Sequence, residues 1–349
     1  MQQKKQRKTG RKSQKHRGSA RPAETGALMK ILYAGSPEAA AVTLKILIEK
    51  QKECGFEIVG VLSNPPSAKG RHKTPTPTPV SELAQEYHLP FYTPEHLDAQ
   101  AREQISPLGA DLLVVFAYGH IFGPKFMALF PMGGINLHPS LLPKYRGCTP
   151  VPAAILNRDE KTAATIQYVS EKMDEGNILA QQIINLDGSE RADSLLLQSA
   201  EIGAQLFCNL LSKNHLPEGK AQTGEASYTK IITKEDAKIN WSESADIIEA
   251  KIRAYYPDPA CWCTESIMGN IQPLKILSAG WIAENDQRAS GYTSEPIGKV
   301  LQFVKSEGIY IKTGSGLLCV KELQRQGKKA MGYKDFMNGA KDFIGTVLE

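Results

Sequence analysis

Near the amino terminus, a strand, a helix and a second strand follow one another directly, and this order limits the folds open to the chain. The first strand is "MKILYAG" (29–35), an apolar, β-rich run that stops at a glycine. The helix follows in "SPEAAAVTLKILIEKQKE" (36–53), with serine at the cap position and proline at the first helical position. The second strand is "FEIVGVLSN" (56–64). Strand, helix and strand open a doubly wound parallel sheet, so we predict a Rossmann-like α/β domain.

The length of the chain and its later apolar pattern predict two domains. A chain of 349 residues is long for one core. After a predicted helix at 192–214 the apolar spacing breaks, and residues 215–236 are polar without a strong period. We therefore predict a first domain over 29–214, a linker over 215–236 and a second domain over 237–349. The first domain has further predicted strands at 110–117, 133–139 and 163–170.

The second domain is predicted to be a small β-barrel. It begins with an amphipathic helix, "SESADIIEAKIRAYY" (242–256), that has a serine at its cap. Short β-type runs with glycine turns follow at 273–282, 298–314 and 316–329. Short strands combined with one helix are typical of an OB-like barrel.

The first 28 residues differ from the rest in charge. They hold nine Lys and Arg against Glu24 alone, so this segment carries +8 of a total net charge of +5, and the remaining residues carry −3. Because the segment has almost no apolar side chain to bury, we predict a disordered basic tail. It is either a solvated extension, or an upstream start before Met29, or a further contact for RNA.

Composition places the chain among globular proteins without a membrane-spanning segment. Hydrophobic residues make up 41% and charged residues 23%, and no apolar run approaches the roughly 18 residues that a membrane span needs. No secretory apolar segment is recognisable either, so we expect the protein in the cytoplasm. The six cysteines are scattered without the spacing of a zinc site or a redox pair, and we expect reduced thiols and no bound metal.

Two polar side chains, Asn136 and His138, mark the end of the strand in "GGINLHPSLLPKYRG" (133–147). Residues two apart on a strand project from the same face, and Pro139 ends the ladder beside them. The carboxyl ends of parallel strands are where an open α/β sheet binds its ligand. Asp174 follows the next predicted strand, and a carboxylate can orient an imidazole and stabilise its charged form. We predict a site formed by Asn136, His138 and Asp174.

These residues carry a resemblance to a known family. The stretch "INLHPSLLPKYRG" (135–147), followed by Asp174, resembles the signature of the folate-dependent formyltransferases. The resemblance implies transfer of a formyl group from 10-formyltetrahydrofolate to an amine, with no metal. It also implies catalytic roles: Asn136 and His138 would donate to the oxyanion that forms at the formyl carbon, and Asp174 would orient His138 and assist proton movement.

The resemblance also implies where the folate would bind. Two segments, "FAYGHIFG" (116–123) and "SLLP" (140–143), resemble the folate cleft of the family. Their backbone groups can offer the amide-like hydrogen bonds that a pterin needs. The expected folate-binding residues are Ala117, Tyr118, Gly119, His120, Ser140, Leu141, Leu142 and Pro143.

Within the family, the chain resembles the members that formylate the methionine of initiator tRNA, over residues 29–349. Segments such as "MKILYAGSPEAA", "IRAYYPDPACW" and "LQRQGKKAM" carry this likeness, as does the second domain. Initiator Met-tRNA and folate are therefore the expected partners, and we expect a monomer. The expected tRNA-binding residues are basic side chains of the proline-rich loop 64–79 and of the second domain: Lys69, Arg71, Lys73, Arg325, Lys328 and Lys329.

Two other functions remain open from the sequence alone. The same chemistry can serve a nucleotide or an amino sugar as acceptor, and Pro139 matches the nucleotide-forming members of the family more often than the tRNA-acting ones. The second alternative is an RNA-binding module without catalysis, which would use the OB-like domain and the basic tail.

Overall fold

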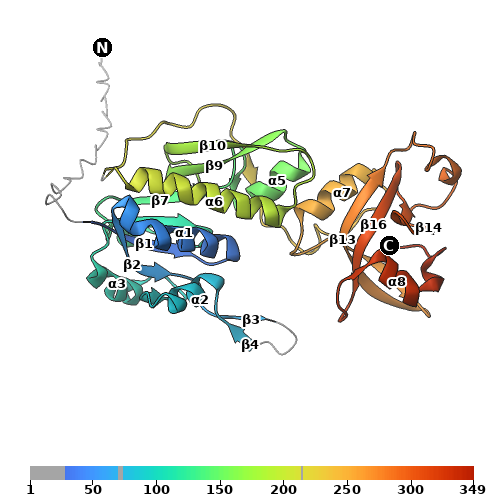
Figure 1. Ribbon diagram of the computed structural model, residues 1–349, viewed down its shortest axis with the longest axis horizontal. Helices are drawn as coiled ribbons and strands as arrows, with labels where there is room; N and C mark the ends of the chain where they lie inside the picture. Colours follow the sequence, from blue (N-terminus) through green and yellow to red (C-terminus); the bar gives the residue numbers. More distant parts are fainter. Residues whose placement is uncertain (1–27, 70–73, 214) are drawn as a thin grey trace, which may run out of the picture.

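The computed structural model describes residues 28–69, 74–213 and 215–349, and a seven-stranded sheet forms the centre of the first domain (Figure 1). The strands lie in the order β10-β9-β7-β6-β1-β2-β5. Their bounds are β1 (Met29–Gly35), β2 (Phe56–Leu62), β5 (Phe91–Tyr92), β6 (Leu112–Phe116), β7 (Gly134–His138), β9 (Lys161–Tyr168) and β10 (Ile178–Asn185). The Rossmann-like architecture predicted from the sequence is confirmed, and its first strand has the predicted bounds.

The sheet is mixed, whereas the sequence analysis predicted a parallel one. The five strands from β5 to β7 in the sheet order are parallel, but β9 pairs antiparallel with β7, and β10 antiparallel with β9. Ile135 near the start of β7 lies opposite Tyr168 at the end of β9. The chain therefore enters β9 at the edge of the sheet where β7 ends. Because no connection crosses to the opposite edge before β9 begins, β9 runs antiparallel to β7.

Helices cover both faces of this sheet, and each face has its own apolar core. Strand β1 alternates between the two: Ile31 and Tyr33 join one core, and Leu32 and Ala34 join the other. Helices α1, α2 and α6 contribute to the first core, and α3 and α4 contribute to the second. The bounds of these helices are α1 (Glu38–Cys54), α2 (Pro79–Glu86), α3 (Ala99–Ile105), α4 (Pro124–Met127) and α6 (Ala192–Leu211).

Helix α1 begins one residue later than predicted, at Glu38. Pro37 takes the cap position that the sequence analysis gave to Ser36, and the Ser36 hydroxyl instead accepts the Asn64 backbone N–H at 3.2 Å. Gly55 ends the helix with a φ of 73°, a left-handed conformation that glycine adopts without strain. The hydrogen bond between Ser36 and Asn64 ties the segment after β1 to the segment after β2.

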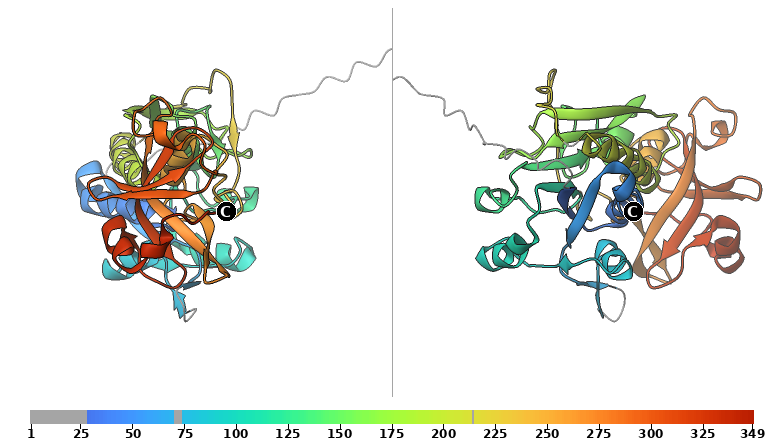
Figure 2. Two further views of the ribbon diagram at one scale, coloured as in Figure 1. Left: turned by 90° about the vertical axis from the view of Figure 1, so that its right-hand side faces the viewer. Right: turned by 60° about the vertical axis from the view of Figure 1, so that its left-hand side comes forward.

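The second domain is a curled antiparallel sheet with two helices at one end of the molecule (Figures 1 and 2). Its six strands are ordered β12-β13-β16-β15-β14, with β17 paired to β16, and this half-barrel confirms the predicted small OB-like domain. The bounds are α7 (Ala245–Ala254), β12 (Trp262–Ile267), β13 (Asn270–Ile282), β14 (Val300–Val304), β15 (Gly308–Lys312), β16 (Leu317–Arg325), β17 (Met331–Gly332) and α8 (Tyr333–Gly339). Short 3-10 helices lie at Ser106–Leu108, Ser290–Tyr292 and Lys341–Phe343.

The two domains share an apolar core. It contains Val151 and Ile155 of α5 (Pro150–Leu156) and Leu195 of α6, together with Ile248 and Ile252 of α7. The same core continues into β13, β15 and β16. The domains are therefore packed directly against each other along α5, α6 and α7.

The segment predicted as a linker, 215–236, pairs with the first domain. Strand β11 (Tyr228–Thr229) lies parallel to β8 (Arg146–Gly147), and Lys220 forms a bridge to Ile178. The Arg146 backbone N–H donates to the Ser227 carbonyl at 2.8 Å. The sequence pattern did not predict these contacts, because they are made by backbone groups and single side chains, which leave no apolar periodicity.

The proline-rich loop predicted at 64–79 contains a short hairpin that projects from the first domain (Figure 1). Its strands are β3 (Ser67–Lys69) and β4 (Thr74–Thr76). Arg71 and Lys73, between these strands, lie outside the described residues, and so does the predicted basic tail up to residue 27.

Three further observations concern the expectations drawn from composition. All six cysteines are free thiols, and five of them are buried. None of the described helices is both long enough and apolar enough to span a membrane. Within the described ranges, no three His, Cys, Asp or Glu side chains converge as metal ligands would.

Candidate active site

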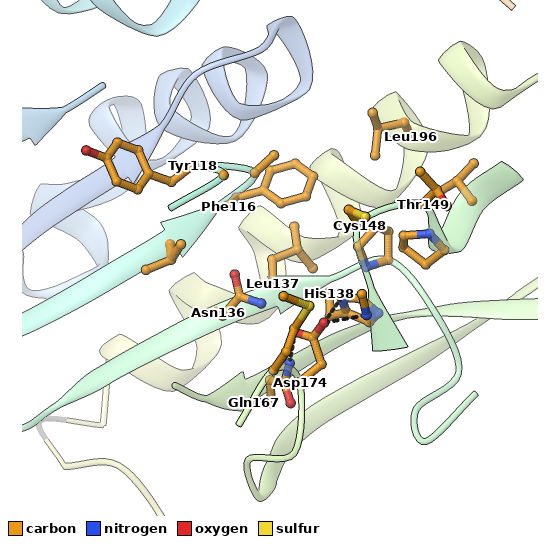
Figure 3. A pocket seen from close by; sticks show the side chains of 18 of the residues that line it. Phe116, Tyr118, Asn136, Leu137, His138, Cys148, Thr149, Gln167, Asp174 and Leu196 are labelled. Carbon is orange, nitrogen blue, oxygen red and sulfur yellow. Dashed lines mark hydrogen bonds and ion pairs between the residues drawn. The ribbon is translucent and has the colours of Figure 1, made fainter. Parts of the chain in front are cut away.

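A cavity of about 630 Å³ opens at the carboxyl ends of β6 and β7 (Figure 3). Residues 115–122, 136–139 and 167–174 of the first domain line it, and residues 147–152 close a further side. The second domain contributes residues 256–258, which follow α7. The volume lies in the range of small-molecule sites, and the position is where open α/β sheets bind ligands.

Asn136 lies in the middle of β7, and its side chain faces the cavity together with His138, as the spacing of two residues predicted (Figure 3). The residue opposite Asn136 on β9 is Gln167. His138 and Gln167 are both hydrogen-bonded, whereas the Asn136 carboxamide has no partner within the part of the chain that the structure describes. Its amide N–H therefore remains available to a ligand in the cavity.

Both nitrogens of the buried His138 ring face protein acceptors. Nε2 lies 2.8 Å from the Tyr145 carbonyl oxygen, and Nδ1 lies 3.5 Å from Asp174 Oδ2. A carbonyl only accepts hydrogen bonds, so Nε2 carries a proton and the neutral ring has its lone pair on Nδ1. Burial lowers the His138 pKa, against smaller opposing effects of the Asp174 charge and the Tyr145 carbonyl. Burial thus favours the neutral ring, and its Nδ1 is the nitrogen that lies beside Asp174.

The resemblance implied that His138 would donate to the oxyanion. In this structure, which holds no substrate, Nε2 of the ring lies 2.8 Å from the Tyr145 carbonyl oxygen. Asn136 has a donor that faces the cavity and makes no hydrogen bond to the described part of the chain. Nδ1 of His138 lies next to the Asp174 carboxylate, a place where an imidazole nitrogen can accept a proton.

The Asp174 carboxylate is held from two other parts of the chain. Oδ1 accepts from Gln167 Nε2 at 2.8 Å, and Oδ2 accepts from the Gly147 backbone N–H at 2.8 Å. Asp174 has a φ of 56°, a left-handed conformation that aspartate tolerates better than most residues. The following turn is tight, because a Cβ on Gly176 would lie 1.8 Å from the Tyr168 carbonyl oxygen. Position 176 therefore requires glycine.

Half of the residues expected to bind folate lie at the cavity. The segment from Ala117 to His120 lines it, and burial raises the pKa of the Tyr118 hydroxyl to about 12. Residues 140–143 do not line it. Ser140 is buried, and its hydroxyl donates to the Lys144 carbonyl at 2.6 Å. The "SLLP" turn thus shapes the backbone behind His138 and presents no group to this cavity.

Of the basic residues expected at a tRNA site, Arg325, Lys328 and Lys329 are described with their side chains, and none of the three lines the cavity. Lys69 ends β3, and Lys328 and Lys329 are exposed after β16. Arg325 is paired within the second domain: Nε and Nη2 donate to the two carboxylate oxygens of the buried Glu265, both at 2.8 Å. Two of its five N–H groups are therefore used in a bidentate pair within the fold.

Three residues of this site were not identified from the sequence. Gln167 and Gly147 donate to Asp174, and Gln222, from the segment 215–236, donates to the backbone carbonyls of Asp174 and Gly176 at 2.7 and 2.9 Å. Gln167 is a polar residue inside a buried, otherwise mostly apolar strand, which is a signal that sequence reasoning can use. Gln222 has no such signal.

A cavity with an unpaired amide donor, a neutral imidazole and a carboxylate at the ends of β7 and β9 suits acyl transfer to an amine. The chain belongs to the formyl transferase family: the family described as "Formyl transferase" matches residues 29–211, and "Formyl transferase, C-terminal domain" matches residues 231–341. It is therefore a formyl-transferring enzyme. Its relatives include the methionyl-tRNA formyltransferase of Treponema denticola, 41% identical over 332 residues that cover 92% of this chain and 100% of that protein. The methionyl-tRNA formyltransferase of Treponema pallidum is 37% identical over 324 residues, which cover 90% and 97%.

Solved structures share the fold at lower sequence identity. HypX from Aquifex aeolicus has a TM-score of 0.58 and 13% identity, covering 91% of this chain and 50% of that one. The N-formyltransferase from Helicobacter canadensis, solved with folinic acid and dTDP-3-aminofucose, has a TM-score of 0.55 and 19% identity, covering 85% and 99%. These likenesses establish a common architecture for both domains.

Proposed function

We propose that the protein transfers the formyl group of 10-formyltetrahydrofolate to the amino group of methionine on initiator Met-tRNA, giving formylmethionyl-tRNA for translation initiation. The observation that carries this proposal is the identity of 41% to a methionyl-tRNA formyltransferase, which extends over both domains. Relatives that act on other acceptors share the architecture at much lower identity. The acceptor is therefore assigned from the relatives, and the chemistry from the cavity.

The cavity has the properties that a folate donor needs. Its walls include the apolar side chains of Val115, Phe116 and Phe122, against which a flat ring system can pack. The backbone from Ala117 to His120 offers amide groups at the same wall. The formyl donor is a substrate of the reaction, and this wall would hold its pterin.

Asn136 would supply the oxyanion donor. When the uncharged amine attacks the formyl carbon, the carbonyl electrons move to the formyl oxygen, which becomes an oxyanion. The Asn136 carboxamide has an N–H that no described residue uses and that faces the cavity. A preorganised donor at this place stabilises charge that is present in the transition state and absent from the substrates.

The His138 and Asp174 pair would take and return the proton. The attacking amine must lose one proton, and Nδ1 of neutral His138 has a lone pair 3.5 Å from Asp174 Oδ2. A proton received there, directly or through a water, is stabilised by the carboxylate. When the bond from the formyl carbon to the folate nitrogen breaks, the same proton goes to that nitrogen. The products are the N-formyl amine and tetrahydrofolate.

A substitution at Asn136 tests the oxyanion role. We expect Asn136→Ala to lower kcat by about 10²- to 10³-fold, as the loss of a comparable donor does elsewhere. The folded state should be little affected, because the carboxamide makes no hydrogen bond within the described chain. Steady-state kinetics with both substrates measures the effect. A kcat within a few-fold of wild type would remove Asn136 from this role.

The acceptor is tested by direct comparison of amines. Purified protein is given the formyl donor with initiator Met-tRNA, and separately with a nucleotide amine and an amino sugar nucleotide. We expect formylation of the tRNA alone. Transfer to a small amine would favour the second acceptor class, and absence of transfer to any of them would favour a non-catalytic RNA-binding module.

Arg71 is proposed to contact the acceptor end of the tRNA. It lies outside the described residues, and the proposal rests on the basic sequence "AKGRHK" and on the hairpin that brackets it. We expect Arg71→Ala to lower kcat/KM for Met-tRNA about tenfold or more, since an arginine bound to phosphate contributes a charge-assisted hydrogen bond. Binding of folate should not change. Lys213→Ala, an exposed cation at the end of α6, is the matched control; an equal loss of folate affinity would instead assign the loop to the donor.

The remaining properties are proposals of the same kind. We place the protein in the cytoplasm, where initiator tRNA is charged, and expect a monomer by light scattering. Lys69 and the exposed Lys328 and Lys329 stay candidates for tRNA contact by charge alone. The domain division at 29–214, 215–236 and 237–349 is also kept as a proposal.

A further inference from the structure

We propose that Gln222, in the segment between the two domains, is a positioning residue that holds the Asp174 loop in its reactive arrangement. The inference rests on the proposed function in one respect, namely that Asp174 and His138 act as the proton-transferring pair. It is based on the Gln222 side-chain amide, whose oxygen and nitrogen both make hydrogen bonds around Asp174.

The nitrogen of the Gln222 amide binds the Asp174 loop. Nε2 donates to the backbone carbonyls of Asp174 at 2.7 Å and Gly176 at 2.9 Å, and it also lies 3.2 Å from Gln167 Oε1. An amide nitrogen has two hydrogens, so the longest of these contacts shares one of them. One side chain therefore fixes both backbone carbonyls that flank the tight turn after Asp174.

The contact with Gln167 determines how the second amide is oriented. Gln167 Oε1 faces the donor on Gln222, which leaves Gln167 Nε2 directed at Asp174 Oδ1, 2.8 Å away. If the Gln167 amide were reversed, its oxygen would face the carboxylate and the two would repel. Gln222 thus acts on Asp174 in two ways: it binds the Asp174 backbone carbonyl, and it orients Gln167, which donates to the Asp174 carboxylate.

Arg146 holds the other side of Gln222. Its Nε and Nη2 both donate to Gln222 Oε1, at 3.1 and 2.8 Å. Nη1 donates to the Tyr228 hydroxyl at 2.8 Å and lies 3.2 Å from Glu175 Oε1. Because the Gln222 oxygen faces two cationic N–H groups and its nitrogen faces carbonyls, the orientation of the amide is determined by its surroundings.

The same segment also positions the second donor to Asp174. Gly147, whose N–H binds Asp174 Oδ2, belongs to β8, and β8 is paired with β11 of residues 215–236. The segment that joins the domains therefore supports the carboxylate from two directions. Loss of Gln222 should let the loop relax and move Oδ2 away from His138 Nδ1.

Two variants separate positioning from packing. Gln222→Met keeps the approximate shape of the side chain and removes its hydrogen bonds, and Gln222→Glu keeps the acceptor for Arg146 but places a carboxylate oxygen against two carbonyls. We expect both to lower kcat by about 10- to 100-fold, as displacements near 1 Å do in active sites, with KM for Met-tRNA within about twofold of wild type. Thr223→Ala, at the exposed neighbouring residue, is the control and should keep wild-type kcat.

A second readout does not need the reaction. Titration of His138 by NMR on isotope-labelled histidine, assigned with His138→Asn, reports the distance of the Asp174 charge from the ring. Asp174 is the charged group beside the ring and raises its pKa, so a displaced Asp174 should make the His138 pKa fall further in Gln222→Met.

The outcomes are distinct. Lower kcat with a shifted His138 titration supports the positioning role, and wild-type kcat in Gln222→Met or an unshifted titration overturns it. If the wild-type protein formylates no Met-tRNA, the proposed function fails, while the His138 titration still decides the role of Gln222.

Discussion

Replacing His138 or Asp174 by alanine should lower kcat by about 10²- to 10⁴-fold, the range that a positioned proton-transfer group contributes. The structure supplies the reason: neutral His138 has its accepting nitrogen 3.5 Å from the Asp174 carboxylate, so each residue needs the other to hold the amine proton. Because the two act as a unit, the double variant should be little slower than either single one. Single-turnover formylation of Met-tRNA measures all three rates.

A variant without the charge and a surface control sharpen this test. Asp174→Asn removes the charge and can still accept the Gly147 N–H through its oxygen, but its Nδ2 then faces the Gln167 Nε2 donor, so we expect a loss of kcat close to that of Asp174→Ala. Glu201→Gln changes an exposed carboxylate on α6 and should have no effect. Near-normal turnover in Asp174→Ala would refute the assignment of the pair. So would a double variant whose loss equals the product of the two single losses.

Replacing Arg325 by alanine should destabilise the protein by about 3–5 kcal/mol, because it leaves the buried Glu265 carboxylate without its partner. The guanidinium also lies 4.6 Å from the Phe336 ring centroid, so packing is lost as well. The thermal midpoint should fall by several degrees in calorimetry. Lys328→Ala, an exposed change three residues on, should shift stability by no more than about 0.5 kcal/mol.

The double variant at this pair isolates the buried charge. Removing Glu265 together with Arg325 leaves no uncompensated carboxylate, so Arg325→Ala with Glu265→Ala should be less destabilised than the sum of the single changes. An Arg325→Ala protein with the wild-type midpoint and weakened tRNA binding would return Arg325 to the tRNA site that the sequence analysis assigned.

The parts of the fold that could be predicted are those encoded locally. The first strand and the helix after it follow from apolar spacing, and Asn136 and His138 share a face because strand alternation requires it. The antiparallel direction of β9 was not predictable in this way. It depends on where the chain re-enters the sheet, which no local pattern records.

The parts of the site that could not be predicted depend on contacts between distant residues. Gln222 lies 48 residues from Asp174, and Arg325 lies 60 residues from Glu265. In both cases a polar side chain in a polar stretch meets its partner only after the chain has folded. Arg325 shows the consequence: the sequence analysis assigned a basic residue in a basic cluster to RNA, and in the structure its guanidinium is paired with the buried Glu265 carboxylate.

The apolar core that α5, α6 and α7 share has a mechanical consequence. A swing of one half of the molecule against the other would expose Val151, Ile155 and Ile252 to water, so the two halves move as a stiff frame. A molecule bound to the half-barrel would then be held at a fixed distance from Asn136. If the half-barrel binds the tRNA, as proposed, the acceptor end must span the distance from that contact to the cavity for its amine to react.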